Sequence, residues 1–286
     1  MSKATIPPPG ELLRRHGLAP RKSWGQNFLH AREILAEITA ATDARAGHTV
    51  VEIGAGLGTL TAHLLAAGPR VEAIERDRDL CVVLRAELGC DPNFVLHEAD
   101  AVRFDYGEIA RARIEAGEDP PTIVGNLPYQ LTGVLLFALL DHHAHTGPWV
   151  VMVQREVADR LCSEPGSKRY GGATAALSRL RGISRVCTVN RGCFLPPPRV
   201  DSAVIRFDPL PEPRGVVGDP KAYLTLVRTC FQRRRKTLAN ALAGVATREQ
   251  ALRWIAQVGL DPQIRPERLG PEQFAALARA READPD

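Results

Sequence analysis

The sequence has no uninterrupted apolar run long enough to span a bilayer, and it carries Pro7–Pro9 where a secretory signal would be apolar. Its six cysteines form no C-x-x-C pair and show no ligand-like spacing. We therefore expect reduced thiols, with neither a disulfide framework nor a metal site. These absences argue against a membrane-spanning protein and against a disulfide-stabilised secreted one, and we expect a cytoplasmic protein.

Lysine is also scarce, because arginine supplies 32 of the 37 cationic residues. Charge is segregated along the chain: residues 31–162 carry 11 Lys/Arg against 20 Asp/Glu, whereas the remainder carries 26 against 13. The segment Pro165–Val200 holds seven Lys/Arg and no acid. Because the planar guanidinium group suits phosphate recognition, this pattern indicates an acidic catalytic part next to a surface that binds a polyanion.

The clearest linker in the chain is the proline-rich segment Asp208–Gly215. Strand and helix patterns alternate over residues 49–160, which predicts an α/β fold with a doubly wound, largely parallel sheet. After the linker the apolar spacing becomes purely helical. We expect a flexible basic arm over residues 1–22, a main domain over residues 23–208 and a small all-α domain over residues 216–286.

A glycine-rich turn follows the first strand of this alternation. Thr49–Ile53 reads as a strand, Gly54–Gly58 as the turn into a helix, and Val71–Ile74 as a second strand that ends at Glu75. Glycines such as Gly56 permit a tight turn and close approach by a ligand, and an acid at this spacing can accept both ribose hydroxyls. The G-x-G-x-G pattern differs from the one that cradles a pyrophosphate, so S-adenosylmethionine (SAM) fits better than NAD.

Two neighbouring segments each have two interpretations. Asp100 lies just past the strand Phe94–His97, where it could accept a hydrogen bond from an adenine amine or simply cap a turn. The segment Trp24–Leu29 leads into a helix at about Arg32–Thr42. It could be the leader of an amphipathic helix or a flap that closes over a cofactor.

The stretch Thr122–Tyr129 is the centre of the functional hypothesis. It reads as a buried strand that stops at a Gly-Asn break and continues into a stiff loop at the ligand-binding edge of the sheet. Asn126 and the carbonyls of Leu127 and Pro128 could accept hydrogen bonds from an exocyclic amine, while Tyr129 covers the face of the ring. The alternative is an ordinary strand-to-helix turn.

Two further motifs suggest contacts with nucleic acid. Phe194 precedes three prolines that stiffen its loop, so its ring could cover the second face of a flipped base or could pack in the core. The run Arg233–Lys236 has no acid near it in the sequence. Its four cations, Arg233, Arg234, Arg235 and Lys236, favour a contact with RNA phosphates over a merely solvated face.

In this order the motifs resemble those of the ribosomal RNA adenine N6-dimethyltransferases (KsgA type). The resemblance covers nearly the whole chain and rests on Gly25–Leu29, Val51–Gly58, Glu75, Asp100, Asn126–Tyr129, Phe194–Ser202 and Phe231–Leu238. It implies a class I SAM-dependent methyltransferase fold, Rossmann-like, with a small C-terminal helical domain. It also implies SAM contacts at Asn27, Leu29, Gly54, Glu75, Asp100 and Asn126. Gln130 departs from the family pattern, in which a proline usually follows, and puts in doubt only the shape of the pocket wall.

The same resemblance implies a substrate: two adjacent adenosines in a hairpin loop near the 3′ end of small-subunit rRNA, within an assembling subunit. We expect a monomer that acts without a metal ion. Three alternatives remain at this stage: a large-subunit rRNA adenine methyltransferase of the antibiotic-resistance type, a non-catalytic rRNA-binding assembly factor, and an NAD-dependent oxidoreductase. The glycine spacing disfavours the last of these.

Overall fold

The computed structural model describes residues 6–21 and 24–284 and divides them into two compact units. The first unit contains the chain up to residue 158 and residues 184–208, and the second contains residues 159–183 and 209–286. The division differs from the one predicted at the linker, because the chain enters the second unit and returns before the linker is reached. Tyr170 and Ala175, which precede the linker, are buried in the core of the second unit.

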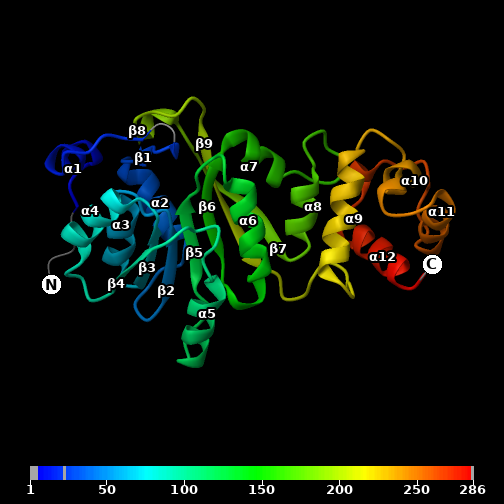
Figure 1. Ribbon diagram of the computed structural model, residues 1–286, viewed down its shortest axis with the longest axis horizontal. Helices are drawn as coiled ribbons and strands as arrows, with labels where there is room; N and C mark the ends of the chain where they lie inside the picture. The colour runs from blue at the N-terminus through cyan, green and yellow to red at the C-terminus, as the bar shows by residue number, and fades with distance from the viewer. Residues whose placement is uncertain (1–5, 22–23, 285–286) are drawn as a thin grey trace. The chain divides into compact units, whose positions relative to one another are not determined.

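A seven-stranded sheet organises the first unit (Figure 1). Its strands are β2 (Thr49–Ile53), β3 (Arg70–Glu75), β4 (Phe94–Glu98), β5 (Thr122–Asn126), β6 (Trp149–Gln154), β7 (Arg181–Val189) and β9 (Ser202–Pro209). The order is β4-β3-β2-β5-β6-β9-β7, with β4 to β6 parallel and β9 antiparallel to β6. The chain runs outward from β2 to β4 and then returns to β5, so the topological switch point lies between β2 and β5.

Apolar strands and the apolar faces of helices make up the core of this unit. The helices are α1 (Pro9–Arg15), α2 (Arg32–Ala41), α3 (Thr59–Ala67), α4 (Arg78–Leu88), α5 (Tyr106–Glu115), α6 (Thr132–Asp141) and α7 (Arg155–Leu161). Every residue of β2 is buried, as expected for a parallel strand that is covered on both faces. Among the described residues, none of the helices combines the length and the apolar character needed to cross a membrane. The architecture confirms the predicted α/β fold.

The second unit is built mainly from helices. They are α8 (Gly172–Ser178), α9 (Pro220–Gln232), α10 (Leu238–Ala241), α11 (Arg248–Gln257) and α12 (Pro271–Glu282). Their apolar faces share one core that contains Tyr223, Leu226 and Phe274. The side chain of Asp219 caps the first turn of α9 by accepting a hydrogen bond from the Lys221 N–H.

The N-terminal segment corrects one prediction. Residues 6–21 do not form a flexible arm, because α1 buries Leu12 and Leu13 in a cluster with Leu80. Arg15 and His16 both contact the Glu87 carboxylate, at 3.1 and 3.0 Å. Arg14 and Arg15, two basic residues of the predicted arm, therefore belong to an anchored helix. The rest of the predicted arm, residues 1–5 and 22, lies outside the described residues.

Candidate active site

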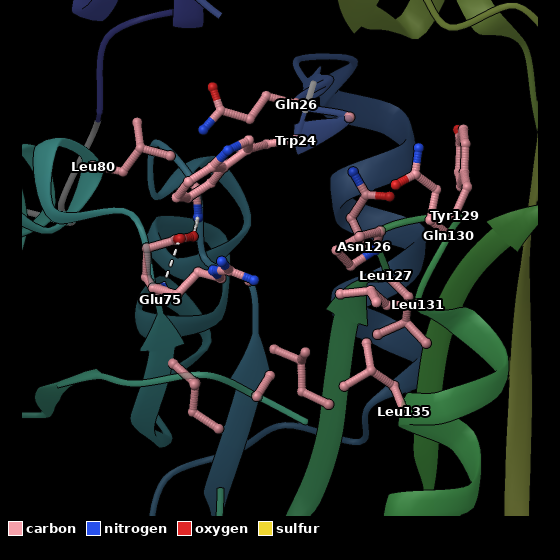
Figure 2. Close-up of a pocket in the computed structure, with 18 of the residues that line it drawn as sticks. Trp24, Gln26, Glu75, Leu80, Asn126, Leu127, Tyr129, Gln130, Leu131 and Leu135 are labelled. Atoms are coloured by element: carbon pink, nitrogen blue, oxygen red, sulfur yellow. Dashed lines mark hydrogen bonds between the residues drawn. The ribbon is translucent and has the colours of Figure 1, made fainter. Parts of the chain in front are cut away.

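A pocket of about 430 Å³ opens at the carboxyl edge of β2, β3 and β5, and its size is typical of small-molecule sites. Five segments make up most of its lining: residues 24–28, the glycine turn, the end of β3, residues 99–101 after β4 and the loop after β5. Figure 2 shows Glu75, Leu80 and Trp24 on one side of this pocket and Asn126, Leu127 and Tyr129 on the other. The structure thus brings the two predicted halves of the site together at the switch point of the sheet.

The glycine turn exposes its backbone to the pocket. Gly54 and Gly56 have φ angles of 72° and 61°, which side chains other than glycine rarely adopt. A Cβ at Gly56 would lie 3.4 Å from the ring of Phe28. On the neighbouring strand, a Cβ at Gly125 would lie 2.5 Å from the carbonyl oxygen of Ile53. Gly125 therefore permits a close approach of the two strands that a side chain would block, whereas Gly56 is favoured by its positive φ.

The Glu75 carboxylate fixes the shape of this turn. It accepts hydrogen bonds from the N–H groups of Gly56 (2.9 Å), Arg76 (2.8 Å) and Asp77 (2.8 Å). Burial raises the pKa of Glu75, and these three hydrogen bonds offset only part of that effect. A carboxylate has about four acceptor sites and three are used here, so one site on Oε2 remains for a hydroxyl donor from the pocket.

A second buried carboxyl group, Glu52, ties β2 to α3 beneath the glycine turn. The Thr61 hydroxyl donates to Glu52 at 2.6 Å, and both side chains are buried. Burial raises the pKa of Glu52 from 4.5 to about 8, and the negative charge of Glu75 adds to the increase. Glu52 was not predicted from the sequence, because an acid inside a strand carries no local signal of its partner.

We expect Glu52→Gln to remove a pH-dependent loss of stability. Since folding raises the Glu52 pKa, the unfolded chain releases this proton first, and the wild-type free energy of unfolding falls as pH rises from 4.5 to about 8. Glutamine keeps the acceptor for Thr61 and cannot ionise. In urea unfolding at several pH values, the free energy of unfolding of the variant should rise relative to that of the wild type. The expected rise is up to about 1.4 kcal/mol per pH unit between pH 4.5 and about 8. Parallel stability curves would contradict the assignment.

The loop after β5 presents a preformed pair of acceptors. The Asn126 side-chain amide donates from Nδ2 to the Asn27 carbonyl at 3.2 Å. Because this hydrogen bond uses the NH2 end of the amide, Oδ1 is left as an acceptor for a ligand. The Leu127 N–H donates to the Met152 carbonyl on β6 at 3.1 Å. The Pro128 carbonyl accepts from the Leu131 N–H at 2.8 Å and is engaged at the start of α6. Leu127 is therefore the better candidate for a carbonyl that accepts from a ligand.

Tyr129 has a fixed position at the pocket wall. Its hydroxyl shares a 2.7 Å hydrogen bond with the hydroxyl of Ser202, the fully buried first residue of β9. Burial raises the Tyr129 pKa, and the Ser202 contact lowers it by less. Ser202 lies 73 positions from Tyr129 in the chain. The sequence analysis named Ser202 within a motif but did not identify this contact.

Asp100 and Trp24 complete the wall near Glu75. Asp100 lines the pocket and also accepts a hydrogen bond from the Val102 N–H at 3.0 Å. It therefore both stabilises the turn after β4 and faces the pocket. Trp24 packs under two guanidinium groups, with Arg21 at 5.2 Å and Arg76 at 4.7 Å from the ring centroid. Trp24 therefore covers part of the pocket, a position that the sequence analysis treated only as part of a leader or flap.

Two predicted site residues lie elsewhere. Leu29 and Phe194 pair across the two short strands β1 (Phe28–Leu29) and β8 (Phe194–Leu195), and both are buried in the core. Neither is among the pocket residues. The stacking role predicted for Phe194 is wrong in this structure, which instead shows the core-packing alternative. The predicted SAM contact of Leu29 is likewise not available to its side chain, whose apolar surface packs in the core.

The basic run Arg233–Lys236 forms a turn after α9, and one of its members is not free. Arg234 pairs with Glu267 at 2.7 Å and donates to the Lys168 carbonyl at 2.6 Å. The expectation that no acid lies near the run is therefore wrong for Arg234. The other three cations are exposed. Within residues 6–21 and 24–284, no group of three or more His, Cys, Asp and Glu side chains could hold a metal ion.

Comparison with known proteins agrees with this geometry. A family model described as "Ribosomal RNA adenine dimethylase" matches residues 17–280. Ribosomal RNA small subunit methyltransferase A of Anaeromyxobacter sp. (strain K) is 46% identical, covering 96% of this chain and 97% of that protein. The protein of the same name from Myxococcus xanthus (strain DK1622) is 40% identical, covering 95% and 94%. The crystal structure of 23S rRNA methyltransferase ErmE matches with a TM-score of 0.66 and 25% identity, covering 89% of this chain and 99% of that one. The chain belongs to the ribosomal RNA adenine dimethylase family, whose members are SAM-dependent methyltransferases.

Proposed function

We propose that this chain transfers methyl groups from SAM to N6 of two adjacent adenosines in the 3′-terminal hairpin loop of small-subunit rRNA, within an assembling subunit. The observation that carries the proposal is the acceptor pair at Asn126 and Leu127, which faces the glycine turn and Glu75 across one pocket. The small-subunit relatives support the choice of subunit. We further propose that the protein acts in the cytoplasm as a monomer.

The residues of the pocket fit SAM. Glu75 offers a buried carboxylate oxygen for a ribose hydroxyl, Asp100 offers a carboxylate for an adenine amine, and Gly54 and Gly56 line the pocket without side chains. Asn27 also lines the pocket, and its carbonyl accepts a hydrogen bond from the Asn126 side-chain amide. When bound, SAM would supply an electrophilic methyl group on a sulfonium centre.

The chain itself contributes the positioning of the nucleophile. The N6 lone pair of adenine is delocalised into the ring, so the amine is a poor nucleophile. Asn126 Oδ1 and the Leu127 carbonyl can each accept one N6 hydrogen, while Tyr129 covers the ring. This arrangement holds the amine in place for attack, and such orientation supplies a large part of a rate enhancement. No titratable base belongs to the acceptor pair, so N6 would lose its proton to solvent after the N–C bond has formed and the S–C bond of SAM has broken.

Dimethylation places a further demand on the same acceptors. After the first transfer one N6 hydrogen has been replaced by a methyl group, and only one hydrogen bond to the pair remains. The second transfer therefore depends on the ring contact of Tyr129 as well. Since Ser202 holds the Tyr129 hydroxyl, the ring keeps its place while the amine changes.

The proposal is tested with tritiated SAM and ribosomal subunits from cells that lack this modification. We expect label in the rRNA of small subunits and background counts in large subunits. Label in the large subunit instead would support the antibiotic-resistance alternative, which the shared fold of ErmE makes the nearest rival. Tight binding of small subunits without transfer of label would support the assembly-factor alternative.

The exposed cations after α9 should contribute to RNA binding through their charge. We expect Arg233→Ala with Arg235→Ala to weaken binding of small subunits and to lower the slope of log Kd against log salt by about 0.7–0.9 per arginine. Arg234→Ala is the internal comparison, since it breaks the ion pair with Glu267 and should lower the thermal stability of the second unit instead. An unchanged salt slope in the double variant would remove this turn from the contact surface.

A further inference from the structure

Arg155 and Arg191 both contact Asp201 near the carboxyl edge of β6, and Arg199 lies two residues before Asp201 in the chain. The Arg155 N–H donates to the Asp201 carbonyl at 3.0 Å, and the Arg155 guanidinium lies 3.4 Å from Oδ2 of the Asp201 carboxylate. The Arg191 N–H donates to Oδ1 of the same carboxylate at 3.2 Å. Arg199, two residues before Asp201, is exposed, as are Arg155 and Arg191. We call Arg155, Arg191 and Arg199 the Asp201 arginine cluster.

The cluster lies next to the residue that positions the catalytic ring. Asp201 is followed by Ser202, which pairs with Gln154 across β6 and β9 and shares a hydrogen bond with the Tyr129 hydroxyl. Arg155 directly follows Gln154. Since β5 and β6 are parallel neighbours, their carboxyl ends meet at one edge of the sheet, and Figure 1 shows β6 beside β5 and β9. The adjacent residues Asp201 and Ser202 thus contact Arg155 and Arg191 on one side and the Tyr129 hydroxyl on the other.

The cluster carries more positive charge than the Asp201 carboxylate can neutralise. A single arginine would pair with this carboxylate, and Asp201 offsets at most one of the three positive charges. The contact between Asp201 and Arg191 uses the backbone N–H, which leaves the Arg191 guanidinium out of that bond. Exposed guanidinium groups are suited to bind phosphate oxygens bidentately.

We propose that the Asp201 arginine cluster binds the RNA phosphates that flank the target adenosine. A base can enter the pocket only if it leaves its stack, so the backbone on either side of it must pass the rim next to Tyr129. Cations at that rim would hold the backbone while the base is extruded. The inference rests on the proposed function, because it assumes an RNA substrate, and it adds a phosphate site on the catalytic unit itself.

The test compares Arg155→Ala and Arg191→Ala with Arg45→Ala in binding to unmethylated small subunits at several salt concentrations. Arg45 is the matched control: it is an exposed arginine that pairs with Asp119, and it precedes β2 at the opposite edge of the sheet. We expect each cluster variant to bind roughly three- to tenfold more weakly and to lose about 0.7–0.9 from the slope of log Kd against log salt. SAM affinity, measured by calorimetry, should stay unchanged.

Salt slopes equal to that of Arg45→Ala in both cluster variants would overturn the inference. Arg155→Lys should recover most of the lost slope, because it restores the charge; failure to recover would assign Arg155 a structural role and count against the inference. The two proposals separate cleanly. If wild-type protein transfers methyl groups and the cluster variants bind normally, only the phosphate site is wrong. If no protein transfers methyl groups but the cluster variants lose salt-dependent binding, only the catalytic proposal is wrong.

Discussion

Asn126→Ala should lower the rate of methyl transfer by roughly two to three orders of magnitude while leaving the affinity for small subunits nearly unchanged. The substitution removes the Oδ1 acceptor and also the Nδ2 donor that contacts the Asn27 carbonyl. The Leu127 carbonyl alone can hold one N6 hydrogen and cannot orient the amine. Single-turnover transfer to saturating small subunits measures the chemical step, and a filter-binding assay measures affinity.

Asn93→Ala is the matched control for this experiment. Asn93 is an exposed asparagine that precedes β4, at the amino edge of the sheet, far in the topology from the acceptor pair. It should transfer methyl groups at the wild-type rate. A wild-type rate in Asn126→Ala would show that the loop after β5 is an ordinary strand-to-helix turn and would remove the catalytic assignment.

Glu75→Gln should weaken SAM binding by roughly ten- to hundredfold. The substitution preserves shape but replaces one carboxylate oxygen by an NH2 group, which cannot accept hydrogen bonds from the Gly56, Arg76 and Asp77 N–H groups together. A ligand hydroxyl that loses its hydrogen bond to a charged acceptor loses about 1.5–3 kcal/mol of binding free energy, and about 1.4 kcal/mol corresponds to a tenfold change in affinity. Titration calorimetry with SAM measures the effect directly.

Glu98→Gln provides the comparison for Glu75→Gln. Glu98 lies opposite Glu75 on the neighbouring strand β4 and is exposed, where it pairs with Arg78 and Arg85. Its substitution should change SAM affinity less than twofold, because exposed ion pairs contribute little. Equal effects of the two substitutions would mean that Glu75 has no specific part in the pocket.

The sheet could be predicted from the sequence because its signals are local. Buried parallel strands appear as short apolar runs, and the predicted strands at Thr49–Ile53 and Thr122–Gly125 match β2 and β5 within one residue. The loop chemistry at Asn126 was equally local, since a proline and an aromatic residue follow within three positions. The structure of these segments is determined by adjacent residues. Their position at the pocket could then be predicted, because ligands of open α/β sheets bind at the carboxyl ends of the strands.

The misassigned residues depend on partners far along the chain. Phe194 faces Leu29 across the β1–β8 pair, and Arg234 finds Glu267 thirty-three positions later. The strand β7 is largely exposed and basic, so it has none of the continuous apolar character of the central strands. The helix α1 is short and begins in a proline-rich segment, which resembles a linker until its packing against Leu80 is known. No window of neighbouring residues contains these relations.

The central claim, an acceptor pair that holds an adenine amine beside the SAM pocket, is tested most directly by the chemical identity of the product. Small subunits that have been incubated with the protein and SAM are digested, and the rRNA nucleosides are analysed by mass spectrometry. The account predicts N6,N6-dimethyladenosine at two neighbouring positions of the 3′-terminal hairpin. Methyl groups on a ring nitrogen, on carbon or on a ribose hydroxyl would contradict it, since the pocket would then hold its substrate by other atoms.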